Sequence, residues 1–102
     1  MDIGLMVEGQ NGLTWERWIH IFQLAERLSF SSLFRSDHYF IGTQRESLDT
    51  FSSLSIAARE TTHLRLGPLV SPITFRSPVE LARTAVSLDD LSNGRFVLGV
   101  GA

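Results

Sequence analysis

Short apolar runs recur along the chain at regular intervals, and a helical pattern fills each gap between them. The runs read as strands over residues 3–8, 32–36, 64–70 and 96–101. Their first residues are 29, 32 and 32 positions apart, and about thirty residues is the size of a βαβ unit. The runs are apolar on both faces, as parallel strands covered by helices are. The pattern therefore predicts an α/β fold.

The first two helices are predicted from apolar spacings of three and four residues. The first begins after Thr14, a suitable N-cap. Its apolar stripe, which makes both tryptophans core residues, comprises Trp15, Trp18, Ile19, Phe22, Ala25 and Leu28. The second helix is predicted to start near Ser47 or Asp49 and to end before Thr61. Its stripe comprises Phe51, Leu54, Ser55 and Ala58.

The third helix has the clearest boundaries in the sequence. Ser77 is a predicted N-cap, Pro78 takes the first helical position, and Glu80 completes a capping box. The turn residues Asn93 and Gly94 end the helix. Its predicted buried face comprises Val79, Ala82, Ala85, Val86 and Leu91.

Composition and charge exclude several classes of protein. Of 102 residues, 43% are hydrophobic and 20% are charged, which is enough to build a core. The formal net charge of −2 argues against a nucleic-acid binder or a polybasic membrane arm. The absence of cysteine excludes disulfides and thiolate chemistry. No apolar run is long enough to span a membrane, and no basic segment precedes an apolar stretch at the start. A cytoplasmic protein is expected.

The βαβ pattern is compatible with two architectures. Half of a (β/α)8 barrel and a small doubly wound nucleotide-binding sheet are built from the same unit. The last residues, 96–102, read as an apolar strand with nothing after it to cover its edge. We therefore expect a single domain over residues 1–102 that is truncated after its fourth strand.

Candidate chemistry lies after the strands, because both architectures bind ligands at the carboxyl ends of parallel strands. Asp37 and His38 follow the second run. A histidine there can donate or accept a proton near neutral pH, and Asp37 can orient it or cap a neighbouring backbone group. The alternative is a loop histidine that is hydrogen-bonded to the backbone.

Other polar or glycine-rich positions are less specific. Arg76 can meet an anionic ligand or pair with an acidic residue of the next unit. The Gly99-Val100-Gly101 segment resembles the start of a dinucleotide-binding loop but lacks the third glycine and helix. His20 and His63 lie on different segments, so no metal site is predicted.

Five motifs follow one another along the chain, at residues 3–10, 32–38, 66–72, 74–78 and 88–95, the last followed by 98–102. Together they resemble the luciferase-like monooxygenase family of flavin- and deazaflavin-dependent oxidoreductases, over essentially the whole chain. The nearest likeness is to members described as coenzyme F-420-dependent oxidoreductases.

The resemblance implies the N-terminal half of a TIM-like (β/α)8 barrel, with the ring of coenzyme F-420 or FMN across the mouth at the strands' carboxyl ends. It assigns Asp37 and His38 as catalytic, with His38 as the proton-handling or substrate-orienting group. It also implies a non-prolyl cis peptide at about Leu69–Val70, where a bulge supports the ring. The implied cofactor contacts are Leu69, Val70, Ser71, Thr74, Gly99, Gly101 and Ala102.

The leading hypothesis is therefore an oxidoreductase that transfers a hydride to or from a small organic substrate, or a monooxygenase. The full-length protein is expected to be a homo-oligomer without nucleic-acid or membrane partners. The rival hypotheses are an inactive assembly module and a small doubly wound nucleotide-binding domain. Because open strand edges recruit other strands, the 102-residue chain alone is not expected to stay monomeric. It is also expected to be inactive, because the later phosphate-binding loops that the family resemblance implies are absent from it.

Overall fold

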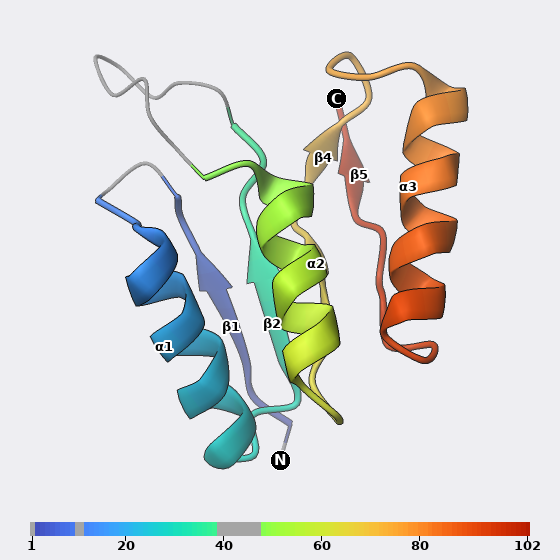
Figure 1. Cartoon of the computed structure of the whole chain (residues 1–102). Coiled ribbons are helices and arrows are strands. Elements are labelled where there is room, and N and C mark those ends of the chain that lie inside the picture. The colour runs from blue at the N-terminus through green and yellow to red at the C-terminus, as the bar shows by residue number, and fades with distance from the viewer. Residues whose placement is uncertain (1, 10–11, 39–47) are drawn as a thin grey trace.

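The computed structural model describes residues 2–9, 12–38 and 48–102, which form parallel strands joined by helices (Figure 1). Ser47, one of the two predicted starts of the second helix, lies outside these residues. Within them, every helix is too short or too polar to cross a membrane. In chain order the elements are β1 (Gly4–Val7), α1 (Trp15–Arg27), β2 (Ser32–Arg35), α2 (Thr50–Glu60), β3 (Arg65–Pro68), β4 (Ser71–Pro72), α3 (Pro78–Leu91) and β5 (Val100–Gly101).

The strands are parallel and follow one another in sequence order. β1, β2 and β3 form one sheet in that order, and β4 pairs with β5 in a second. An isolated parallel bridge between Leu66 in β3 and Phe96 joins the two chain segments before the β4–β5 pair begins. A doubly wound sheet places its first strand inside the sheet, whereas β1 pairs with β2 alone among the described strands. The sequential order is consistent with part of a (β/α)8 barrel.

One face of the main sheet carries the core. In β2, Leu33 and Arg35 are buried, while Ser32 and Phe34 on the other face are only half-buried. Helices α1 and α2 lie on the same side of these strands (Figure 1). Among the described residues, the helices that cover the main sheet therefore gather on its more buried face (Figure 1).

The core forms where α1 and α2 meet the sheet. The rings of Trp18 and Phe22 pack edge to face with centroids 5.9 Å apart. The indole N–H of Trp18 donates to the carbonyl of Ser53 at 2.7 Å. Buried beside them, Arg35 donates to Ser53 Oγ at 2.7 Å and to the carbonyl of Leu48 at 2.9 Å. Burial lowers the pKa of Arg35, although nearby carboxylates oppose that shift.

The helix boundaries follow the predicted caps. Thr14 accepts from the backbone N–H of Arg17, and Ser77 accepts from that of Glu80. Asp49, the other predicted start of the second helix, is the N-cap of α2. Past α3, Asn93 and Gly94 both have positive φ, 56° and 82°. Local side-chain chemistry thus fixes where these helices begin and end.

The predicted helix faces are only partly correct. Trp18, Phe22 and Ala25 of α1 are buried, but Trp15 at its first position is 41% exposed. In α3 the buried residues are Leu81 and Leu88, seven positions apart and facing α2. The predicted face is wrong: Val79 and Val86 are 69% and 70% exposed, and Ala82 and Leu91 are exposed as well. Because α3 is apolar on more than one side, periodicity alone does not select the buried side.

The predicted third and fourth strands are shorter than expected. The run at 64–70 keeps only β3, and β4 begins just beyond it at Ser71; the run at 96–101 keeps only β5 and the bridge at Phe96. Pro68 has no N–H to donate to a ladder, and the pairing resumes at Ser71. Five short strands therefore replace the four that were predicted.

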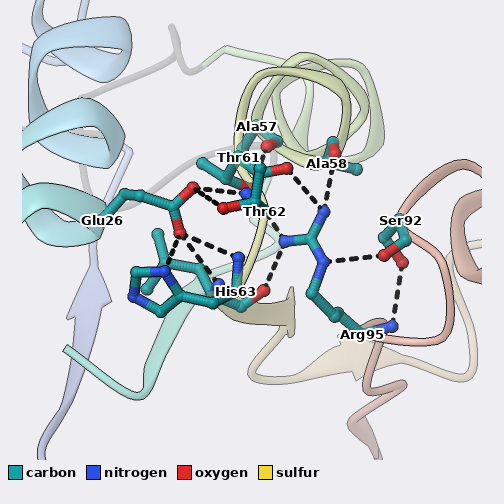
Figure 2. Close-up of polar contacts among 9 residues, drawn as sticks. Glu26, Ala57, Ala58, Thr61, Thr62, His63, Ser92 and Arg95 are labelled. Atoms are coloured by element: carbon teal, nitrogen blue, oxygen red, sulfur yellow. Dashed lines mark hydrogen bonds and ion pairs between the residues drawn. The ribbon is translucent and has the colours of Figure 1, made fainter. Parts of the chain in front are cut away.

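Two polar side chains hold the end of the molecule where β3 begins (Figure 2). The Glu26 carboxylate accepts from the backbone N–H groups of Thr62, His63 (3.0 Å) and Leu64 (3.2 Å), and it lies 2.8 Å from Nδ1 of His63. This places His63 in a structural contact before β3, away from the strands' carboxyl ends.

Arg95 ties the segment after α3 to the end of α2 (Figure 2). Its guanidinium donates to the carbonyls of Ala58 (2.9 Å), Thr61 (2.9 Å) and Leu64 (2.7 Å). The last carbonyls of a helix lack partners within the helix, so Arg95 satisfies groups at the end of α2 that would otherwise be left to solvent.

The Glu26 contacts make stability depend on pH. Burial raises the pKa of Glu26, but the hydrogen bonds from His63, Thr62 and Leu64 outweigh burial and hold that pKa below its ordinary value of 4.5. A carboxylate with a lowered folded-state pKa stabilises the fold fully above the unfolded pKa. That contribution is lost as the pH falls through the folded pKa.

Replacement of Glu26 by Gln is therefore expected to lower the free energy of unfolding at pH 7 by about 2 kcal/mol, because a charged acceptor is lost. The deficit is expected to shrink as the pH falls from 4.5, where the carboxylate of the unfolded chain protonates, through the lower pKa of the folded state. Urea titrations at a series of pH values measure it. Glu60→Gln, at an exposed position on α2, is the control. A deficit that stays constant from pH 7 to pH 3 would contradict this account.

Candidate functional site

The carboxyl ends of the parallel strands point to one end of the molecule (Figure 1). Asp37 and His38 follow β2, and the turn at residues 73–76 follows β4. Gly101 and Ala102 stand at the end of β5. The predicted site residues therefore share one end of the fold, as the strand order requires.

Asp37 is buried, and both of its carboxylate oxygens are hydrogen-bonded. Ser71 Oγ donates to Oδ2 at 2.8 Å, and Arg76 Nη2 donates to Oδ1 at 3.1 Å. Arg76 Nη1 makes a second contact with Oδ2 and also donates to Ser71 Oγ at 3.1 Å. Arg76 thus pairs with an acidic residue, although with one from the preceding unit and not from the next.

We call this group of Asp37, Ser71 and Arg76 the Asp37 clamp. The Arg76 guanidinium also lies over the ring of Phe51, 4.6 Å from its centroid, which adds α2 to the elements that the clamp joins. The clamp therefore connects the end of β2, the start of β4 and the first turn of α2. This geometry favours a holding role for Asp37 over the catalytic role predicted from the sequence.

His38 has a different environment from its neighbour. Its side chain is exposed, and no hydrogen bond joins the imidazole to another described residue. The described residues therefore do not bear out the alternative of a histidine bonded to the backbone. An exposed imidazole at the strand ends can exchange protons with a ligand.

Leu69 and Val70 project from a bulge between β3 and β4. Leu66 pairs with Phe96, and Ser71 pairs with Val100. The chain therefore advances five residues on one segment but only four on the facing one. One extra residue on one of two paired segments is a β-bulge. The Leu69–Val70 peptide is cis, at the position implied by the family resemblance.

The bulge is fixed at both ends by backbone hydrogen bonds. The N–H of Leu69 donates to the carbonyl of Arg35 at 2.7 Å, and that of Ser71 donates to the carbonyl of Gly99 at 2.8 Å. Between these anchors the side chains of Leu69 and Val70 are 46% and 38% exposed. The bulge thus presents two aliphatic side chains at the strand ends.

Close packing explains why glycine stands at position 101 in β5 and at position 99 just before it. A Cβ added to Gly99 would lie 2.5 Å from the carbonyl oxygen of Pro68, and one added to Gly101 would lie 2.6 Å from Val70 Cγ2. Close approach to the bulge therefore accounts for the Gly-Val-Gly spacing without a dinucleotide loop. Thr74 and Ala102 are exposed at the same end. Cofactor contacts by these residues stay predictions.

The sequence reasoning missed Arg35 and Phe51. A charged residue inside an otherwise apolar strand is the signal that marks Arg35, while nothing local marks the Phe51 ring as a partner of Arg76. The described residues hold no group of three potential metal ligands. His20 is exposed on α1, on a different element from His38 and His63.

Comparison with curated proteins gives relatives of two kinds of activity. The chain is 33% identical over 95 residues to 4-hydroxyprotoasukamycin monooxygenase of Streptomyces nodosus subsp. asukaensis, covering 89% of this chain and 24% of that protein. It is 32% identical over 82 residues to 5,10-methylenetetrahydromethanopterin reductase of Methanolobus tindarius, covering 80% of this chain and 23% of that protein. The chain thus spans about a quarter of these relatives' length.

The solved structures that the chain resembles also include a monooxygenase and a reductase. Monooxygenase RslO1 from Streptomyces bottropensis superposes with a TM-score of 0.87 at 28% identity, over 99% of this chain and 33% of that one. The coenzyme F-420-dependent tetrahydromethanopterin reductase from Methanopyrus kandleri gives a TM-score of 0.84 at 25% identity, over 98% of this chain and 26% of that one. The profile of the luciferase-like monooxygenases matches residues 1–102. The chain belongs to the luciferase-like monooxygenase family.

Proposed function

We propose that this chain is the N-terminal part of a (β/α)8-barrel oxidoreductase that binds the ring of coenzyme F-420 or FMN at the carboxyl ends of its strands. The reaction is hydride transfer between that ring and a small organic substrate. The observation that carries the proposal is that exposed His38 and the exposed pair Leu69 and Val70 lie at the same end of the sheet.

These residues fit a planar heteroaromatic ring. Binding sites for such groups are mostly apolar, with few polar groups that fix orientation. Leu69 and Val70 offer an aliphatic surface for a ring face, and His38 offers a titratable group beside it. When bound, the ring supplies the hydride chemistry, which no side chain of this chain can supply.

The chain's own residues then have distinct roles. His38 gives a proton to, or takes one from, the substrate atom that changes its bond order. Leu69 and Val70 would line one face of the ring. Ser71 is fully buried with its hydroxyl in the Asp37 clamp, so it would hold that segment in place and would not contact the ring. Thr74, Gly99, Gly101 and Ala102 complete the wall.

The relatives support either cofactor. One relative, 38% identical over 80 residues, is a coenzyme F-420-dependent glucose-6-phosphate dehydrogenase of Intrasporangium calvum. The oxygenating constituent of a diketocamphane monooxygenase from Pseudomonas putida, 21% identical, was solved with FMN, and its TM-score of 0.86 supports the fold. Monooxygenation is the second candidate reaction, favoured by the 33% identical monooxygenase.

Titration of the full-length protein with coenzyme F-420 and with FMN tests the proposal. We expect one of them to bind with a dissociation constant of about 1 μM or below, which corresponds to about −8 kcal/mol. Oxygen consumption with the reduced cofactor and substrate separates monooxygenation from hydride transfer. A folded protein that binds neither cofactor would contradict the proposal.

His38→Ala in the full-length protein is expected to lower kcat by about 10²–10⁴-fold, the range for a group that transfers a proton. The melting temperature and the cofactor dissociation constant should change little, because the imidazole is exposed. His20→Ala, another exposed histidine, is the matched control. An unchanged kcat would show that His38 transfers no proton in the reaction.

The Asp37→Asn variant tests whether Asp37 stabilises the fold or takes part in catalysis. The change removes the counter-charge of Arg76 in a buried contact, so the free energy of unfolding is expected to fall by about 3 kcal/mol. The shape of the pH profile of kcat is expected to stay that of the wild type. Asp90→Asn, at an exposed position on α3, is the control. Wild-type stability with a lost limb of the pH profile would make Asp37 catalytic.

A further inference from the structure

We propose that Val70 and Gly101 are a size-matched pair, in which the missing side chain at position 101 sets how far Val70 projects into the ring site. This inference deepens the proposed function and rests on it. It makes residue 101 a determinant of cofactor binding although glycine itself has no side chain with which to touch the cofactor.

The packing between the two residues is tight. A Cβ at Gly101 would lie 2.6 Å from Val70 Cγ2 and 3.4 Å from Val70 Cβ. A Cβ at Gly99 would lie 3.6 Å from Val70 Cγ1, which is ordinary contact. Since residues two apart on a strand share a face, the isopropyl group of Val70 lies over both glycines and is closest to Gly101.

Val70 has little freedom to withdraw from an added methyl group. The flanking N–H groups of Leu69 and Ser71 are bonded to Arg35 and Gly99. The N–H of Ile73 donates to the carbonyl of Gly101 itself at 2.8 Å, which keeps the two segments together. A β-branched side chain is also stiff at χ1. A methyl group at 101 must therefore move Val70 toward its exposed side.

That exposed side is the one on which the ring is proposed to lie. An aliphatic surface that is displaced by a fraction of an ångström loses close contact with a flat ligand or collides with it. Gly101→Ala is expected to weaken binding of the cofactor by about 10-fold or more, as overpacking in a fitted site does.

The experiment is a double-mutant cycle in the full-length protein with Gly101→Ala, Val70→Ala and both together. The probe is whichever of coenzyme F-420 and FMN the wild type binds. Val70→Ala makes room for the new methyl, so the double variant is expected to bind as Val70→Ala does and more tightly than Gly101→Ala. The melting temperatures of the cofactor-free variants are expected to show the same coupling, because the contact exists without ligand.

Gly4→Ala is the matched control. Its added methyl would also meet the end of a side chain, Ser32 Oγ at 2.3 Å. That contact lies at the start of β1, away from the carboxyl ends of the strands. It is expected to bind the cofactor as the wild type does. If Gly101→Ala does not fold, Val70→Ile probes the same contact from the other side and is expected to weaken binding.

The outcomes separate this inference from the proposed function. A wild type that binds neither cofactor overturns the proposed function and this role with it. A wild type that binds, together with a Gly101→Ala variant of equal affinity, overturns the inference alone. A double variant that binds no better than Gly101→Ala also overturns it, because the effect would then not pass through Val70.

Discussion

The shape of the candidate site depends on one extra residue between Leu66 and Ser71. The facing segment advances four positions while this one advances five, so the surplus residue must leave the ladder. Backbone hydrogen bonds at Leu69 and Ser71 determine where it leaves, and the side chains of Leu69 and Val70 are exposed as a result. Gly99 and Gly101 leave the room that this arrangement needs, next to the backbone of Pro68 and the side chain of Val70.

The two ends of the fold use charged groups differently. Where β3 begins, Glu26 and Arg95 satisfy backbone groups of loops and a helix end, and His63 serves the same structure. At the opposite end, Asp37 and Arg76 pair with each other and with Ser71, next to the bulge. The contacts of Asp37 thus hold the chain next to His38, whose own side chain stays exposed.

Much of this fold can be predicted from local sequence, but the parts that depend on distant pairing cannot. The N-cap at Ser77 is predictable because its hydrogen bond reaches only three residues along the chain, to the N–H of Glu80. The structure confirms it. The bulge is a mismatch between segments about thirty residues apart; its position came from family resemblance and not from the pattern. The buried side of α3 is set by α2, which is why Val79 and Val86 were assigned to the wrong face.

A crystal structure of the full-length protein with its bound cofactor tests the central claim most directly. The account predicts that one face of the ring lies in van der Waals contact with Leu69 and Val70, with the His38 imidazole at the ring's reactive edge. A ring bound elsewhere on the molecule, with Val70 still exposed to solvent, would contradict it.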